Sequence, residues 1–372
     1  MMKKMVANTC TDLFYQMIRS VIGTSDERLD NPLPEVWKGL YEMTQQQSLL
    51  GILFHGIEKN PEMRPPRELL LKWYAISEQI RRANEKTNEA AVELTDYFRA
   101  IGFRSCILKG QGNTLNYPDP YIRMSGDIDI WLEGGHDKIM KFVNSQWPGM
   151  LERYHHVEIP AWRGIPVEIH FTPSFMNAPW MNKRMQGWFM ENAEEQFSHA
   201  VTLPDGAGTV CIPTNSFNII YQLSHIYRHL FSEGIGLRQL VDYYYLLRKA
   251  KDDHGQQSTD YRELAATLKW LGMYKIATAV MWVLKEKLGL EDEYLIVSPN
   301  EKEGRFLLDE IMMGGNFGQY DTRLGSKEGE GIVHRYFRMS LRNMRYVQHY
   351  PSEALCEPFF RTWHFFWRLR HK

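Results

Sequence analysis

Residues 107–132 read ILKGQGNTLNYPDPYIRMSGDIDIWL, and both the fold and the candidate chemistry start from this stretch. An apolar run is followed by a Lys-Gly turn, a polar segment and a second apolar run that carries Asp127 and Asp129. If the second run is a β-strand, its side chains alternate between two faces, so both carboxylates lie on one face and Ile128 and Ile130 on the other. Two like charges about 7 Å apart along a strand repel each other, and a divalent cation between them removes that repulsion.

A third carboxylate follows in the segment PVEIH, residues 166–170. Apolar and polar residues alternate here, which places Glu168 and His170 on one face of a second strand. If this strand pairs beside the first in register, Glu168 joins Asp127 and Asp129. Three carboxylates on two adjacent strands suit nucleotidyl transfer with two Mg²⁺ ions, which neutralise a nucleoside triphosphate (NTP) and lower the pKa of the attacking oxygen.

The turn between the two apolar runs supplies candidate phosphate contacts. Its backbone N–H groups can face phosphate oxygens, and Gly110 allows the backbone to approach them closely. Lys109 and Arg123 are the nearest cations able to contact a triphosphate. Either of these two side chains could instead form a structural ion pair with one of the acids.

Hydrophobic periodicity predicts the elements around this stretch. Residues 1–102 are expected to be helical, with a long helix marked by apolar residues every three or four positions from Leu69 to Ile101. Residues 103–171 contain four short runs of strand character and a helix over 136–147, and residues 203–206 predict a hairpin turn. Helices return from Thr214 onward, at 216–231, 237–250, 261–271 and 274–288.

The sequence therefore predicts an α+β protein with a small mixed β-sheet. An N-terminal helical region, residues 1–102, is expected to pack on an α/β core, residues 103–212. A C-terminal helical domain, residues 213–372, is expected to close the cleft.

Several features outside the core have alternative interpretations. His225 and His229 lie four apart and predict a polar strip facing the cleft or an interhelical hydrogen bond, because a zinc pair needs further ligands. Arg238 and Asp242 predict a salt bridge within one helix. The glycine- and charge-rich segment 314–331 is expected to be a flexible connector or a lid.

The chain from residue 332 onward is locally basic, with eight Arg and Lys against two Glu. Four of these arginines fall on one face of a predicted helix: Arg335, Arg338, Arg342 and Arg345. Three alternatives stand for this face. It is solvated or paired within the chain, it binds an anionic partner such as RNA by combining charge with aromatic stacking, or it attaches to a membrane surface through the aromatic tail.

Composition excludes some function classes. The 44 basic and 45 acidic residues balance, so no global field favours nucleic acid or membranes. The four cysteines lie far apart and show neither a zinc-ligand spacing nor a disulfide framework. No apolar run reaches the ~18–20 residues of a membrane span, and we expect a cytoplasmic protein.

The pattern LKG…L.Y…R.SGDIDI, followed by VEIH, resembles the DNA polymerase β-like nucleotidyltransferase superfamily. More closely, it is similar to an uncharacterised bacterial nucleotidyltransferase branch and to nucleotidyltransferase toxins of abortive-infection systems. The resemblance is specific across residues 105–171. It continues more weakly into SHIYRHL…LRQLVDYYYLL, which is similar to an H…H…R.L.D segment of the family.

The resemblance implies a nucleotidyltransferase fold with Asp127, Asp129 and Glu168 as catalytic metal ligands. It places Gly110 and Ser125 at the nucleotide phosphates, and the adjoining Gln111 and Gly126 complete the predicted nucleotide-binding set with Lys109 and Arg123. Gln111 is a departure from the family, whose turn is usually Gly-Gly or Gly-Ser.

The leading hypothesis is a Mg²⁺-dependent enzyme that transfers NMP from an NTP to an unknown acceptor, which is a small molecule, a protein or RNA, and releases pyrophosphate. The alternatives are a non-catalytic nucleotide-binding or scaffold relative, in which Gln111 weakens turnover, and a toxin that modifies tRNA.

Overall fold

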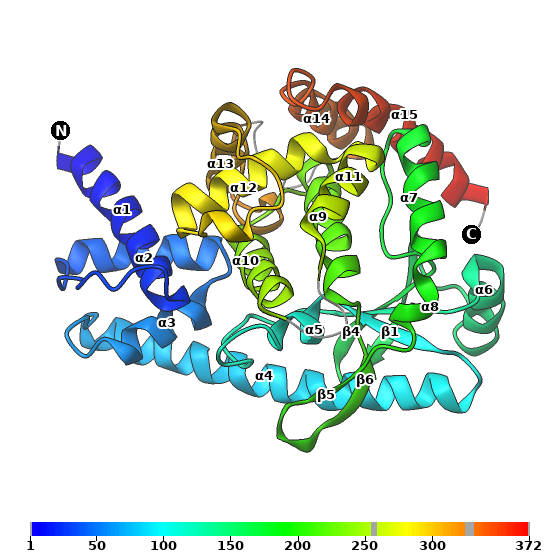
Figure 1. Ribbon diagram of the computed structural model, residues 1–372, viewed down its shortest axis with the longest axis horizontal. Helices are drawn as coiled ribbons and strands as arrows, with labels where there is room; N and C mark the ends of the chain where they lie inside the picture. Colours follow the sequence, from blue (N-terminus) through cyan, green and yellow to red (C-terminus); the bar gives the residue numbers. More distant parts are fainter. Residues whose placement is uncertain (1, 254–258, 324–330, 371–372) are drawn as a thin grey trace.

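The computed structural model describes residues 2–253, 259–323 and 331–370, and it contains a four-stranded mixed sheet (Figure 1). The strand order is β1-β2-β4-β3. The β1–β2 and β3–β4 pairs are antiparallel, and β2 runs parallel to β4. The predicted α+β fold with a small mixed sheet is confirmed. The strands are β1 (Ser105–Leu108), β2 (Ile128–Leu132), β3 (His156–Trp162) and β4 (Ile165–His170).

The two faces of the sheet bury against different parts of the chain. On β2, Ile128, Ile130 and Leu132 belong to a core cluster that also contains residues of α4 and α6. Trp131 belongs to a second cluster, built mainly from the N-terminal and C-terminal helices. Because side chains alternate along a strand, Asp129 shares the Trp131 face. The acidic residues are therefore directed at the helical part of the molecule.

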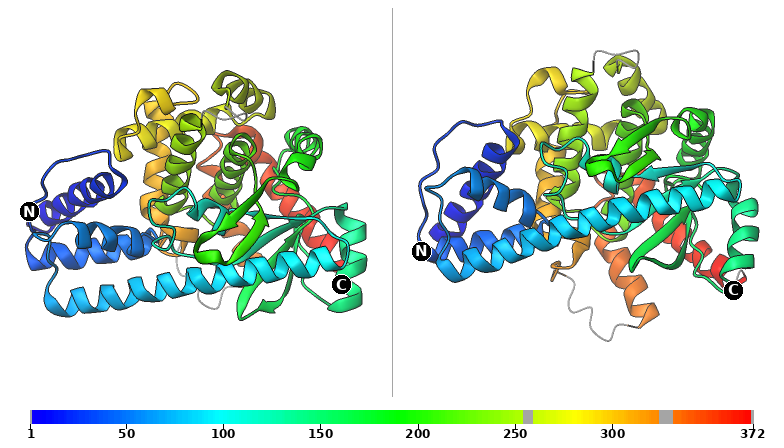
Figure 2. Two further views of the ribbon diagram at one scale, coloured as in Figure 1. Left: turned by 60° about the horizontal axis from the view of Figure 1, so that its bottom comes forward. Right: turned by 90° about the horizontal axis from the view of Figure 1, so that it is seen from below.

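The helix α4 (Arg67–Ala100) connects these two clusters. With 34 residues it is about 51 Å long, and Figure 2 shows it running past both the N-terminal helices and the sheet. Trp73 and Ile80, in its first half, lie in the helical cluster. Leu94 and Phe98, near its end, lie in the sheet cluster. The predicted long helix is thus confirmed, and its apolar side chains pack in both core clusters.

Shorter elements complete the sheet region. The helix α6 (Gly135–Gln146) leads from β2 towards β3, and α5 (Gly110–Thr114) follows the Lys-Gly turn. The predicted hairpin is present as β5 (Ala200–Leu203) and β6 (Gly208–Cys211), with the turn η1 (Pro204–Gly206) between them.

Helices make up most of the remaining structure, and the predicted C-terminal helices are confirmed to within a few residues. The N-terminal helices are α1 (Met2–Ile22), α2 (Pro34–Gln46) and α3 (Leu50–Lys59). The others are α7 (Pro179–Glu191), α8 (Ala193–Gln196), α9 (Asn215–Ser232), α10 (Leu237–Asp252), α11 (Tyr261–Leu271), α12 (Tyr274–Leu288), α13 (Glu301–Gly314), α14 (Ile332–Met344) and α15 (Pro351–Arg370), with the short turns η2 (Asp292–Tyr294) and η3 (Asn316–Gly318).

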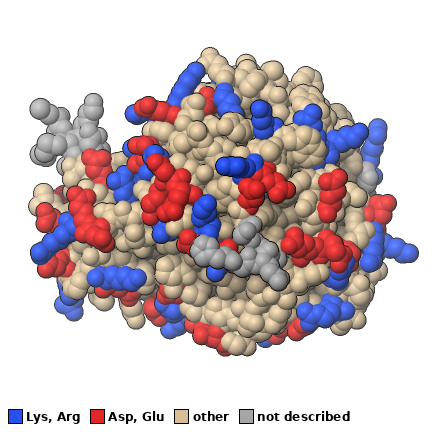
Figure 3. All heavy atoms as spheres, viewed as in Figure 1, with Lys and Arg blue, Asp and Glu red and all other residues tan. Residues whose placement is uncertain are grey.

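Two arginines of the predicted basic face, Arg342 and Arg345, form contacts within the protein. Arg342 is buried and donates to the backbone oxygens of Leu230 and Phe231. Arg345 pairs with Glu310 at 3.2 Å. On the face shown in Figure 3, basic and acidic side chains are interspersed. Within the described residues, no helix has both the length and the apolar character that crossing a membrane requires.

One polar contact ties α4 to the segment that leads into β2. The buried Asn84 donates through Nδ2 to the backbone oxygens of Tyr121, at 3.1 Å, and Arg123, at 2.8 Å. An Asn84→Ala variant leaves both carbonyls without this donor, and we expect it to be about 1–3 kcal/mol less stable. Urea unfolding measures this loss. Glu85→Ala, at an exposed position on the next residue, is the control and should change stability by less than about 0.5 kcal/mol. Equal unfolding midpoints for the two variants would contradict the assignment.

Candidate active site

A cavity of about 820 Å³ lies between the acidic face of the sheet and the helices α9 and α10. Residues from the Lys-Gly turn, the segment before β2, and β4 form one wall. The opposite wall comes from the two helices and from the chain around η3. The residues that line the cavity include Lys109, Gly110, Arg123, Ser125, Gly126, Asp127, Asp129, His156, Glu168, His225, Arg228, His229, Arg238, Asp242, Asn316, Phe317 and Gln319.

Strand register brings the predicted carboxylates together. Asp129 on β2 and Glu168 on β4 are directly paired across the parallel strands, as predicted. Asp127 lies immediately before β2, two residues from Asp129, and is exposed to the cavity. Asp129 itself is buried, and Glu168 is partly accessible. The three acids thus line one edge of the cavity. Asp127 is the most accessible of them, Glu168 is partly accessible, and Asp129 is the most deeply buried.

Two cationic or proton-donating side chains hold Asp129. Its Oδ2 lies 2.9 Å from the Lys109 Nζ, and its Oδ1 lies 2.9 Å from the His170 Nε2. Burial acts to raise the pKa of Asp129, but the charge of Lys109 and the hydrogen bond from His170 outweigh it and hold that pKa below its ordinary value. Asp129 is therefore a stable carboxylate despite its burial.

The Lys-Gly turn aims Lys109 by means of an unusual backbone. Lys109 has φ 51° and ψ −134°, and Gly110 has φ 38°. A positive φ costs a residue with a side chain about 1–3 kcal/mol, and such strain is concentrated at functional sites. The same Nζ also lies 2.9 Å from the His225 Nε2 on α9. The turn thus connects the acidic edge of the sheet to the opposite wall.

Asp127 is electrostatically unlike Asp129. Repulsion by Asp129 is the main cause that raises the pKa of Asp127 to about 6, and the protein walls of the cavity, which shield Asp127 from bulk water, add to it. A cation placed between the carboxylates would relieve this repulsion. One ligand atom each from Asp129, Glu168 and His170 also lie within 4.8 Å of one another. Mg²⁺ prefers carboxylate oxygens, so Asp129 and Glu168 fit such an ion, while Asp127 lines the same cavity but is not in this close group.

Two arginines on the opposite wall have no carboxylate partner among the described residues. The Arg228 Nη2 contacts the His229 Nε2 at 2.9 Å, and the Arg238 Nη1 donates to the Met124 backbone oxygen at 2.7 Å. The Nε of each arginine is buried without a hydrogen-bond partner. Burial lowers the pKa of both guanidinium groups, so their charge is incompletely compensated. The wall facing the carboxylates is therefore suited to an anion.

Arg123 lines the same cavity but is engaged by the protein. Its Nε and Nη2 bind both oxygens of Asp242, at 2.7 and 2.8 Å, and both residues are buried. Tyr117 donates to the same carboxylate at 2.7 Å. The salt bridge predicted between Arg238 and Asp242 is wrong, because Asp242 takes the arginine from the loop before β2 instead.

The cavity contains every predicted site residue except Gln111. The side chain of Gln111 is buried and donates to the Asn88 Oδ1 on α4. His225 and His229 do form a polar strip facing the cleft, as predicted. In the segment 314–331, Asn316, Phe317 and Gln319 line the cavity, while residues 324–330 lie outside the described part of the chain.

Sequence analysis did not identify Arg228 and Arg238 as candidate site residues. The sequence of α9 contained a signal for Arg228. This helix is mostly apolar and buried almost throughout, and yet it carries His225, Arg228 and His229. Polar side chains at helical spacing on a buried helix indicate a lined cavity.

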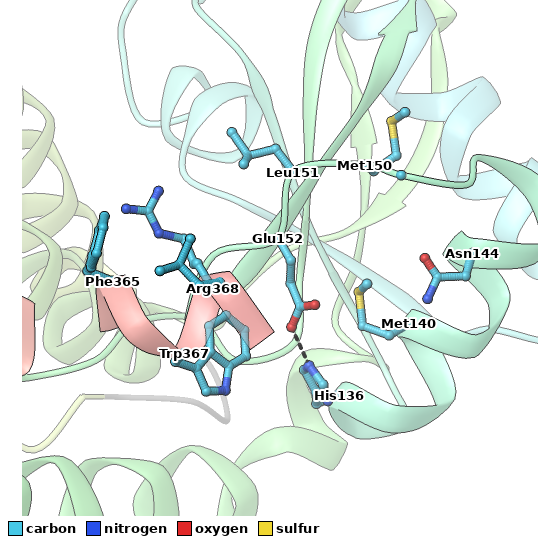
Figure 4. A pocket seen from close by; sticks show the side chains of 11 residues that line it. His136, Met140, Asn144, Met150, Leu151, Glu152, Phe365, Trp367 and Arg368 are labelled. Atoms are coloured by element: carbon cyan, nitrogen blue, oxygen red, sulfur yellow. Dashed lines mark hydrogen bonds and ion pairs between the residues drawn. The ribbon is translucent and has the colours of Figure 1, made fainter. Parts of the chain in front are cut away.

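A second cavity, of about 910 Å³, lies between α6, the chain at 149–152 and the end of α15 (Figure 4). Its lining is largely apolar, with Met140, Met150 and Trp367 among the residues shown. His136 and Glu152 form an ion pair there at 2.6 Å. The cavity contains none of the predicted site residues, so we assign the chemistry to the first cavity.

Comparison with known proteins gives two findings besides a family match. No curated protein matches the chain. A solved structure of an antigenic nucleotidyltransferase-like protein from Paracoccidioides brasiliensis is similar, with 12% sequence identity and a TM-score of 0.33. The similar region covers 59% of this chain and 96% of that protein.

The family match covers the sheet, most of the cavity lining and most of the surrounding helices. The model of the family described as uncharacterised nucleotidyltransferase matches residues 34–289, which is more than half of the chain. These residues include Asp127, Asp129 and Glu168 and also the two arginines of the opposite wall. The chain therefore belongs to the uncharacterised nucleotidyltransferase family.

Proposed function

We propose that the protein is a Mg²⁺-dependent nucleotidyltransferase that transfers NMP from an NTP to an acceptor and releases pyrophosphate. The observation that carries the proposal is the arrangement of three carboxylates on one wall of a cavity. The other wall presents two arginines that have no carboxylate partner in the part of the chain that the structure describes. Such a cavity suits a ligand that is itself a polyanion and carries a divalent cation.

In the reaction, an acceptor oxygen attacks the α-phosphorus, and the bond from that phosphorus to the oxygen bridging to the β-phosphate breaks. Asp127, Asp129 and Glu168 would hold Mg²⁺, which when bound neutralises phosphate charge and lowers the pKa of the attacking oxygen. Lys109 keeps Asp129 ionised and orients it. The proton of the acceptor passes to solvent water in the cavity, and the leaving pyrophosphate carries away the electron pair of the broken bond.

The phosphate contacts are proposed to come from both walls. Gly110, Ser125 and Gly126 line the cavity beside the carboxylates, as expected for residues at the phosphates. We assign the charge neutralisation to Arg228 and Arg238, since Asp242 already neutralises Arg123 and Asp129 already pairs with Lys109. Gln111 then contributes through its side-chain bond to α4, which fixes α5, more than through contact with the nucleotide.

The carboxylate site is tested with Asp127→Asn and Asp129→Asn, and with Asp137→Asn as an exposed acidic control. Loss of one buried charge partner commonly costs at least ~2 kcal/mol, which is about a 30-fold weaker Kd for Mg-NTP. Isothermal titration with Mg²⁺ and each NTP measures the change. Wild-type affinity in the Asp127→Asn/Asp129→Asn double variant would show that the site is assigned incorrectly.

Replacement of Arg228 or Arg238 should weaken Mg-NTP binding without lowering the stability of the ligand-free protein. Arg228→Met and Arg238→Met should each weaken Mg-NTP binding about 10- to 100-fold, because each removes a hydrogen bond to a charged group worth about 1.5–3 kcal/mol. The ligand-free variants should unfold at the same or a higher temperature than wild type, since a poorly compensated buried charge is replaced by an apolar side chain. Arg248→Met, which breaks the exposed pair with Glu291, is the control for binding. If the two arginines serve only the fold, the Arg228→Met and Arg238→Met variants would unfold at a lower temperature than wild type and bind Mg-NTP as tightly as wild type.

Turnover is tested by incubating the protein with each α-phosphorus-labelled NTP, Mg²⁺ and a cell extract. Transfer of label to a protein, an RNA or a small molecule is expected, and it should disappear in the Asp127→Asn/Asp129→Asn variant. Labelled tRNA would identify the tRNA-modifying alternative. Tight Mg-NTP binding without any transfer would favour a nucleotide-binding scaffold instead of an enzyme.

A further inference from the structure

Three histidines gather beside the carboxylates, where β3 begins and β4 ends. His155 precedes β3, His156 opens it, and His170 closes β4, directly paired with His156 across the two strands. Their ring centroids lie 4.4 to 5.3 Å apart, and all three residues are buried. One ring nitrogen from each lies within 4.8 Å of the others. The proposed nucleotidyl transfer uses His170 only to hold Asp129, and it gives His155 and His156 no role.

The contacts within this group have the spacing of ligands around one metal ion. The His155 Nε2 lies 3.1 Å from the His156 Nδ1. The Glu168 Oε2 lies 3.4 Å from the same His156 nitrogen and 3.5 Å from the His170 Nε2. In a tetrahedral zinc site the ligands lie about 2.1 Å from the ion, and the edges of that tetrahedron are about 3.4 Å long. The three distances are close to this edge length.

Burial isolates this group of imidazoles from bulk water. His155 and His170 are only 3% and 1% exposed, and His156 is 8% exposed. The Nε2 atoms of His155 and His170 face the group, whereas their Nδ1 atoms point away from it and have no hydrogen-bond partner among the described residues. The position of an ion is therefore indicated by the clustered ring nitrogens and not by the unpartnered ones.

We propose that His155, His156 and His170 form a site for a transition metal ion of the zinc class, in which three imidazole nitrogens bind the ion and water completes a four-coordinate set. Imidazole nitrogens select such ions, whereas the all-oxygen set of Asp127, Asp129 and Glu168 selects Mg²⁺. The ion would replace the proton that His170 shares with Asp129. It would enter through the cavity, which His156 and Glu168 line.

The test uses metal-free, full-length protein titrated with Co²⁺, whose visible absorption is intense in four-coordinate sites and weak in six-coordinate ones. We expect a single Co²⁺ ion per chain with intense absorption, and we expect Zn²⁺ to displace it. His155→Gln should weaken Co²⁺ binding at least ~100-fold, the upper range for loss of a residue that only supports a ligand. His199→Gln, whose histidine contacts the Ile212 backbone oxygen away from the cluster, should bind Co²⁺ as wild type does.

The proposal is overturned if wild-type protein binds no Co²⁺, if the bound ion shows only weak six-coordinate absorption, or if His155→Gln binds as tightly as wild type. Thermal unfolding of each metal-free variant shows whether it is folded, and His156→Gln replaces His155→Gln if the latter is not. The site does not depend on the proposed transfer reaction. Asp127→Asn should keep the Co²⁺ signal while losing Mg-NTP binding, so failure of one proposal is visible separately from failure of the other.

Discussion

The buried carboxylate of Asp129 is the constraint on which the cavity depends. It is surrounded by like charges, with Asp127 two residues before it and Glu168 paired beside it on β4. The contacts from Lys109 and His170 help to keep it ionised there. Because Lys109 also reaches His225 on α9, the same charge sets the distance between the sheet and the opposite wall. Loss of one partner from such a buried pair commonly costs about 3–5 kcal/mol, so this geometry is tightly determined.

The alternation of side chains along β2 and β4 places the core-packing residues on one face of the sheet and the cavity-lining acids on the other. Ile128, Ile130 and Ile169 bury the face towards α4 and α6. Asp129 and Glu168 project from the other face, where α9 and α10 supply cations and imidazoles. A single-residue slip in the register would exchange the two faces and destroy both functions at once. The fold and the site are therefore specified by the same pairing.

The parts of the structure that depend on local pattern could be predicted from the sequence. Period-two alternation identified the strands and put Glu168 beside Asp129, and apolar spacing identified α4. Interactions between distant segments could not be predicted in this way. Asp242 lies four residues from Arg238 on α10, but it binds Arg123, which is 119 positions earlier in the chain. Spacing within a helix carries no information about a loop that folds against it. Arg228 was missed for the same reason, because the cavity wall that it faces is built from segments distant in the sequence.

The helix α4 has a consequence for how the chain unfolds. Its first half is buried in the helical cluster and its second half in the sheet cluster. Melting either cluster removes packing from a helix that the other also needs, so the two should lose structure together as one cooperative unit. A fragment that begins at residue 103 would lack the surface on which Ile128 and Ile130 are packed. The N-terminal helices are in this sense part of the folding unit that carries the carboxylates, although none of those acids lies in them.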